Sequence, residues 1–457
     1  MQERKWLLLG AIPALLLLWG FLVPVCAEGT AEAQWQKADK GFRAGRYAEA
    51  KQIYEQFIVE RGEINKTPGQ RVLNAHILLQ LGRCCRNLHE FGKGRDVLGR
   101  IIGKYSDDTE ACSAAQYEIG LSYAKEGLKS LASAALEKVV TNYPQERGIG
   151  AYALLKKAKI DCHPSRYGEA VKTLKRLIAD YSDKKGICAE AKWILAETLD
   201  NSYRADEALQ VLDGIGQDKA SSDDDKGEAL VQAANVQLHA LRFGDAKQTC
   251  GKLLEQCAGR KWYEARAKYA MIQVLCEDGS DPDTALGLID EMRKLPWHIG
   301  DRSRLAQLAL WEGGAYWIKV DYKKADECFT RLIADYGDVS DIVGQAYFHR
   351  VRLRTYGLKA YDDAASDIAR IPVAYLRHYA QGDLDFAQGQ YEKAASEFEN
   401  VMTTLPQHRV SSTEPLRALR RLRLSYEKLG RKAEAASALG RLTKLKSDRN
   451  LPNEEVE

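Results

Sequence analysis

A pattern of three side chains that recurs eleven times constrains the fold of this 457-residue chain more than any other feature. Each copy has a small residue, an apolar residue four positions later and another apolar residue three positions after that. This spacing places the three side chains on one stripe of a helix. The small residues are Ala50, Gly94, Ala132, Ala170, Ala208, Ala246, Ala285, Ala325, Ala364, Ala394 and Ala435. Their separations are 44, then 38 four times, then 39, 40, 39, 30 and 41.

The apolar residues continue through every unit, from Tyr54 to Leu439 at the second position and from Phe57 to Leu442 at the third. In eight units another small residue lies twelve positions before the first one, and the exceptions are Gln273, Arg352 and Arg423. Two small residues at this distance allow two antiparallel helices to cross closely. Each unit is therefore predicted to be a helical hairpin.

A single hairpin cannot bury its apolar stripe, so the hairpins have to stack on one another. We therefore predict an all-α chain, a right-handed α-α superhelix of about eleven hairpins with the first helix of each hairpin on the concave face. The repeat array is expected to cover residues 28–449. Residues 450–457 are polar and are expected to form a disordered tail.

The repeat resembles the tetratricopeptide repeat. The unit from Ile119 and Gly120 through Ala132 to Pro144 matches that family's order of small, aromatic and apolar residues best. The longer period is similar to the repeats of periplasmic outer-membrane assembly lipoproteins and Tol–Pal-associated proteins. This resemblance covers roughly residues 31–445 and implies a protein-binding scaffold.

The N-terminus has the layout of a secretory signal. A short segment with Arg4 and Lys5 precedes a continuous apolar run, and small residues then precede Glu28. We expect residues 1–27 to be a signal peptide that is cleaved after Ala27, and the mature protein to be periplasmic. Two alternatives stay open: a lipid anchor at Cys26 and an uncleaved N-terminal anchor.

The composition and motifs give no support for catalysis. The formal net charge is +3, and it becomes +2 without residues 1–27, which gives no general case for nucleic-acid binding. The chain lacks HExxH, GxSxG, P-loop and GxGxxG motifs, and its eight histidines are scattered. We expect no enzyme activity, no catalytic, cofactor or metal site, no nucleic-acid partner and no small-molecule substrate. The cysteines contain no CxxC pair, and we interpret them as core residues, although disulfides are an alternative.

Aromatic residues on the first helices of units eight to ten are the candidate binding site. Eight positions before the small residue these units carry Trp317, Tyr356 and Phe386, and fifteen positions before it they carry Leu310, His349 and Tyr379. Side chains at these positions are expected to face the concave groove and bind an apolar or extended peptide. The alternative is that they pack between helices.

The segment 415–449 is strongly basic, with eleven Lys and Arg residues against Glu427, Glu434 and Asp448. We interpret it as the polar outer surface of the last unit, with an acidic partner or anionic lipid as the alternative.

These features together predict an exported scaffold that binds envelope or outer-membrane proteins through its concave face. Two alternatives are a non-catalytic helical module of a cell-wall enzyme and a structural subunit of an outer-membrane assembly or secretion complex.

Overall fold

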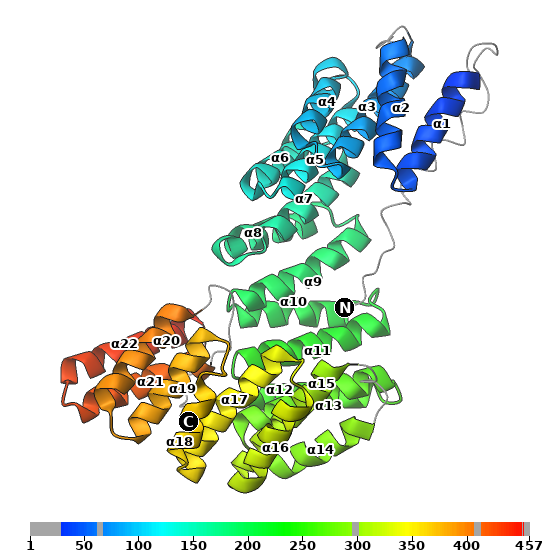
Figure 1. Cartoon of the computed structure of the whole chain (residues 1–457). Helices are drawn as coiled ribbons and strands as arrows, with labels where there is room; N and C mark the ends of the chain where they lie inside the picture. Colours follow the sequence, from blue (N-terminus) through cyan, green and yellow to red (C-terminus); the bar gives the residue numbers. More distant parts are fainter. Residues whose placement is uncertain (1–28, 62–66, 295–300, 406–412, 450, 452–457) are drawn as a thin grey trace. The chain divides into compact units, whose positions relative to one another are not determined.

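The computed structural model describes residues 29–61, 67–294, 301–405, 413–449 and 451. In this part of the chain the secondary structure is helical without strands, and twenty-two α-helices follow one another in a repeated arrangement (Figure 1). The prediction of an all-α repeat array is confirmed. The predicted signal peptide at residues 1–27 and nearly all of the predicted disordered tail at residues 450–457 lie outside the described residues, and so do residues 62–66, 295–300 and 406–412.

The chain divides into two compact units, one ending at Ile160 and the other beginning at Asp161. The helices of the first unit and its boundary are α1 (Gly29–Arg43), α2 (Tyr47–Arg61), α3 (Pro68–Asn87), α4 (Phe91–Lys104), α5 (Thr109–Glu126), α6 (Lys129–Asn142) and α7 (Arg147–Asp161).

The second unit contains the remaining helices and the candidate site. They are a short 3-10 turn (Pro164–Arg166), α8 (Tyr167–Asp180), α9 (Lys185–Asn201), α10 (Ala205–Gln217), α11 (Asp223–His239), α12 (Phe243–Gln256), α13 (Lys261–Asp278), α14 (Pro282–Lys294), α15 (Arg302–Ile318), α16 (Tyr322–Asp335), α17 (Ser340–Leu353), a π-helical turn (Arg354–Leu358), α18 (Tyr361–Ile368), α19 (Ala374–Ala387), α20 (Tyr391–Thr404), α21 (Thr413–Lys428) and α22 (Lys432–Asp448).

The repeating stripe is the core of both units. All eleven small residues are buried, and so are ten of the eleven apolar residues at the second position and all eleven at the third. The exception is Leu439, which is 43% exposed. Leu439 lies on α22, in the last hairpin of the described residues, where no further described helix follows to cover it.

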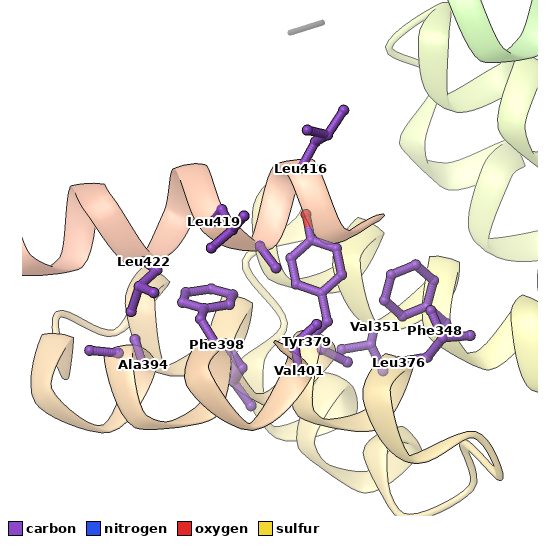
Figure 2. Packing of buried hydrophobic residues seen from close by; sticks show 14 of the residues in the cluster. Phe348, Val351, Leu376, Tyr379, Ala394, Phe398, Val401, Leu416, Leu419 and Leu422 are labelled. Atoms are coloured by element: carbon purple, nitrogen blue, oxygen red, sulfur yellow. The ribbon is translucent and has the colours of Figure 1, made fainter. Parts of the chain in front are cut away.

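The small residue on the first helix makes room for the bulky residue on the second. A Cβ atom added to Gly82 would lie 2.6 Å from the side chain of Leu98, and one added to Gly382 would lie 2.8 Å from the ring of Phe398. Both bulky side chains are fully buried (Figure 2 shows Phe398 between α20 and α21). The two helices of such a hairpin therefore cross so closely that no room remains for a methyl group on the glycine.

Contacts between hairpins give the second unit its curvature. Successive first helices contact each other from α11 through α13, α15, α17 and α19 to α21, whereas successive second helices make at most marginal contact in the described part of the chain. An array whose first helices approach more closely than its second helices bends toward the first helices. These helices therefore line the inner face of the unit.

The last hairpin of this unit returns to its earlier hairpins. The guanidinium of Arg449 lies over the ring of Tyr203, 4.8 Å from its centre, and Leu451 joins the same buried cluster as Leu241 and Leu416. Tyr203 and Leu241 are in the turns after α9 and α11. The end of the array therefore packs against the turns that follow two of its first helices.

We predict that Gly313→Ala destabilises the second unit by about 1–3 kcal/mol, because a Cβ atom there would lie 2.5 Å from the buried ring of Phe329. The neighbouring variant Gly314→Ala is the matched control. Nothing lies within 4 Å of its added Cβ atom, and the lower flexibility of alanine should stabilise the helix by about 0.5–1 kcal/mol. Urea unfolding followed by circular dichroism measures both, and equal stabilities of the two variants would contradict the close crossing.

Candidate functional site

The structure places the six predicted groove residues on consecutive inner elements of the second unit. Trp317 is in the last turn of α15, His349 is on α17, Tyr356 is in the π-helical turn and Phe386 is on α19, and all four are partly buried. Leu310 and Tyr379 are 5% and 1% exposed and belong to hydrophobic core clusters.

Because they are buried, the side chains of Leu310 and Tyr379 do not offer a contact surface; they support the neighbouring residues from within. In Figure 2 the ring of Tyr379 points from α19 toward α21. For the four partly buried residues, contact with a ligand stays a prediction.

An arginine, which the sequence analysis noted only as a departure from the repeat, connects these aromatic residues. Arg352 occupies the position that holds a small residue in eight other units. Its guanidinium lies over three rings, 5.5 Å from the centre of Trp317, 5.5 Å from that of Phe348 and 5.3 Å from that of Tyr379. Cation–π contacts of this kind are attractive, so they hold the guanidinium close to the rings.

Asp383 holds this arginine in place. The carboxylate is fully buried, and it accepts a hydrogen bond from Arg352 Nε at 2.9 Å and another from the Tyr356 hydroxyl at 2.8 Å. Burial raises the pKa of Tyr356, and the Asp383 charge raises it further, so this phenol remains a donor. A buried carboxylate needs such partners, because an unpaired buried charge is strongly destabilising.

A second arginine reaches the same carboxylate from α21. Arg421 Nε lies 3.5 Å from Asp383, and the guanidinium lies 4.8 Å from the ring centre of Tyr356 and 5.1 Å from that of Phe386. The candidate site therefore includes charged residues that we did not predict from the sequence. We use the name inner wall for Trp317, His349, Arg352, Tyr356, Phe386 and Arg421, which these hydrogen bonds and ring contacts connect, together with Arg417, which lies one helical turn before Arg421 on α21.

The inner wall contains a histidine, His349, whose imidazole is surrounded by aromatic rings. Its imidazole stacks on Phe329 with ring centres 6.1 Å apart and meets Phe348 and Trp317 edge-on. Burial, followed by the charges of Arg352 and Arg417, lowers the pKa of His349 to about 3. The imidazole is therefore neutral at physiological pH and serves as part of the aromatic packing.

The cysteines form part of the packing. All nine from Cys84 to Cys328 are free thiols, and seven of them are buried. Cys112 and Cys188 donate to the backbone carbonyls of Tyr105 and Tyr181 at 3.1 and 3.0 Å. Burial raises the pKa of Cys84 to about 12. Thiols in such surroundings are poor nucleophiles, which agrees with their interpretation as core residues.

Within the described residues, no three His, Cys, Asp or Glu side chains come together as possible metal ligands. No described helix is long and apolar enough to cross a membrane.

Two arginines of the basic segment 415–449 form ion pairs with the preceding hairpin. Arg441 pairs with Glu399 at 2.8 Å, and Arg431 pairs with Glu392 at 3.0 Å. Both glutamates are on α20. These arginines therefore hold the last hairpin to its neighbour, as a polar terminal repeat would, whereas Arg417 and Arg421 belong to the inner wall.

Comparison with known proteins supports the repeat assignment. Residues 114–146, which span most of α5 and all of α6, match the tetratricopeptide repeat family, in the unit whose sequence resembles that family best. No curated protein is significantly similar to the chain in sequence.

Solved structures with similar folds have low sequence identity to the chain. The yeast Tom70 structure is 13% identical over 92% of this chain and 85% of its own, with a TM-score of 0.40. The APC/C hetero-tetramer Cut9–Hcn1 is 14% identical over 90% and 86%, with a TM-score of 0.32. The P58(IPK) TPR domain is 13% identical over 87% and 99%, with a TM-score of 0.29.

We predict that His349 makes the protein less stable as pH falls from about 6.5 toward 3. Its pKa is lower in the folded than in the unfolded chain, so the unfolded state takes up the proton first and gains stability over this range. The variant His349→Phe keeps the aromatic packing and should lose about 1–2 kcal/mol less than the original protein between pH 7 and pH 5. Urea unfolding at the two pH values measures this difference, and parallel losses in both proteins would contradict the prediction.

Proposed function

We propose that this protein is an exported scaffold that binds partner proteins through the inner wall of its second unit. The chain is an α-helical repeat array with a tetratricopeptide-type unit, a class of fold that presents long surfaces for protein binding. The single observation that carries the proposal is the convergence of Trp317, Tyr356 and Phe386 with arginines on consecutive first helices. Partly exposed aromatic and arginine side chains dominate the binding energy of protein interfaces.

The rigidity of the inner wall supports this proposal. Asp383 joins the π-helical turn, α17 and α19 by hydrogen bonds, and the ring contacts of Arg352 and Arg421 extend the connection to α15 and α21. Side chains that are already fixed lose little conformational entropy when a partner binds. The same network therefore favours binding without a rearrangement of the helices.

Export is proposed from the sequence of the N-terminus. Residues 1–27 have the charged, apolar and small-residue segments of a signal peptide. The resemblance to periplasmic repeat proteins favours an envelope process and an envelope or outer-membrane protein as the partner.

We predict that Trp317→Ala and Phe386→Ala each weaken partner binding at least about tenfold, because a central aromatic anchor contributes roughly 2 kcal/mol or more. The partner is first captured by cross-linking in cells that express the full chain, and its affinity for each purified variant is then measured. Leu439→Ala is the control, since Leu439 is an exposed apolar residue on the outer helix α22. Circular dichroism checks that each variant is folded. Unchanged affinity in both aromatic variants would remove the inner wall as the binding site.

We predict that the mature protein begins at Glu28. Expression in a bacterium with two membranes, followed by mass spectrometry of the N-terminal peptide, tests this. Ala27→Phe should block the cleavage, whereas Cys26→Ser should leave both the cleavage and the soluble periplasmic fraction unchanged. A lipid-modified Cys26 or an intact Met1 in the original protein would contradict the proposed processing.

A further inference from the structure

The arginines of the inner wall have more N–H donors than the hydrogen bonds that they form with the described residues. A guanidinium group has five N–H donors. Arg352 donates through Nε to Asp383, and Arg421 Nε lies 3.5 Å from the same carboxylate, which already accepts the Tyr356 hydroxyl. Arg417, one helical turn before Arg421 on α21, forms no hydrogen bond or ion pair with any residue in the described part of the chain. The wall therefore offers unused donors from at least two arginines.

Arg417 lies in surroundings that disfavour its positive charge. Burial and the neighbouring charge of Arg352 lower the pKa of Arg417, although Glu414 on its own helix and Glu277 on α13 act in the opposite direction. Neither of these carboxylates forms an ion pair with Arg417. A negatively charged group placed next to Arg417 would add to the partial compensation by these two glutamates.

Aromatic rings lie next to the arginine donors of the inner wall. Arg421 lies over Tyr356 and Phe386, and Arg352 lies over Trp317. When the flat face of a guanidinium rests on an aromatic ring, its N–H groups remain available at the edge of the plane, which is the geometry that binds a carboxylate with two parallel hydrogen bonds. The wall thus combines apolar rings with donors suited to carboxylates.

We propose that the inner wall binds an acidic segment of the partner protein, with carboxylates held by Arg417 and Arg421 and apolar side chains placed against Trp317 and Phe386. This inference rests on the proposed function, because it names the chemistry of the partner at the same surface. Charge complementarity selects an acidic segment, and the rings favour one in which apolar residues stand beside the acidic ones.

A selection from a library of random short peptides on the purified full chain tests this inference. We expect the enriched peptides to combine Asp or Glu with apolar residues and to bind less tightly at high ionic strength. Arg417→Gln should weaken their binding about ten- to hundredfold, the effect of losing a charged hydrogen-bonded pair. Arg441→Gln is the matched control. It removes an arginine of the same basic segment 415–449, but this arginine pairs with Glu399 outside the inner wall. The variant should therefore change binding less than about twofold.

The possible results distinguish the acidic segment from the proposed binding surface itself. Enriched peptides that are neutral or basic, or that bind Arg417→Gln normally while losing affinity for Trp317→Ala, would overturn the acidic segment and leave the binding surface in place. Peptides that bind Trp317→Ala and Phe386→Ala as tightly as the original protein would overturn both. The chain also carries Glu454, Glu455 and Glu457. If changing all three to Gln tightened peptide binding at least tenfold, the occupant would be the chain's own acidic segment, and the proposal of a partner segment would be wrong.

Discussion

The close crossing of two helices within each hairpin is the constraint on which the rest of this structure depends. A small residue on the first helix faces a bulky, fully buried residue on the second, as with Gly82 and Leu98, and no space for another methyl group remains. This contact buries only part of the second helix, so its outer side needs the first helix of the next hairpin. Stacking therefore follows from local packing, and Leu439 on the last hairpin of the described residues stays exposed.

The inner wall arises where the repeat departs from this rule. At Arg352 a long cation replaces the small residue, and it turns toward the inner face, where Asp383 and three aromatic rings receive it. The buried pair differs from the exposed ion pairs of the outer surfaces, because its partners are surrounded by packed side chains and further hydrogen bonds. A surface that is rigid, aromatic and rich in arginine donors is suited to recognising another protein. The outer basic residues differ from it, because they form ion pairs with α20.

The candidate site could be predicted only in part. Position within the repeat identified Trp317, Tyr356 and Phe386 as inner residues, and the structure brings them together with partly exposed rings. The same rule also selected Leu310 and Tyr379, which are buried, because period alone does not show how far a side chain lies beneath its neighbours. Arg421 and Asp383 were missed as site residues. Two signals in the sequence pointed to this network: the absence of a small residue at Arg352, and the basic segment 415–449, which contains Arg421.

The sequence by itself determined the all-α class, the number of repeat units and the core residues of the repeating stripe, because a helix with a periodic apolar stripe must pack that stripe against neighbouring helices to remove it from water. Only the tertiary structure decided that the array divides at Ile160 and Asp161, that its last hairpin returns to Tyr203 and Leu241, and that Arg352, Asp383 and Arg421 meet. These features depend on small rotations between successive hairpins that add up along the array. A repeat pattern specifies each contact between neighbours, but it does not specify where the accumulated curvature brings distant residues together.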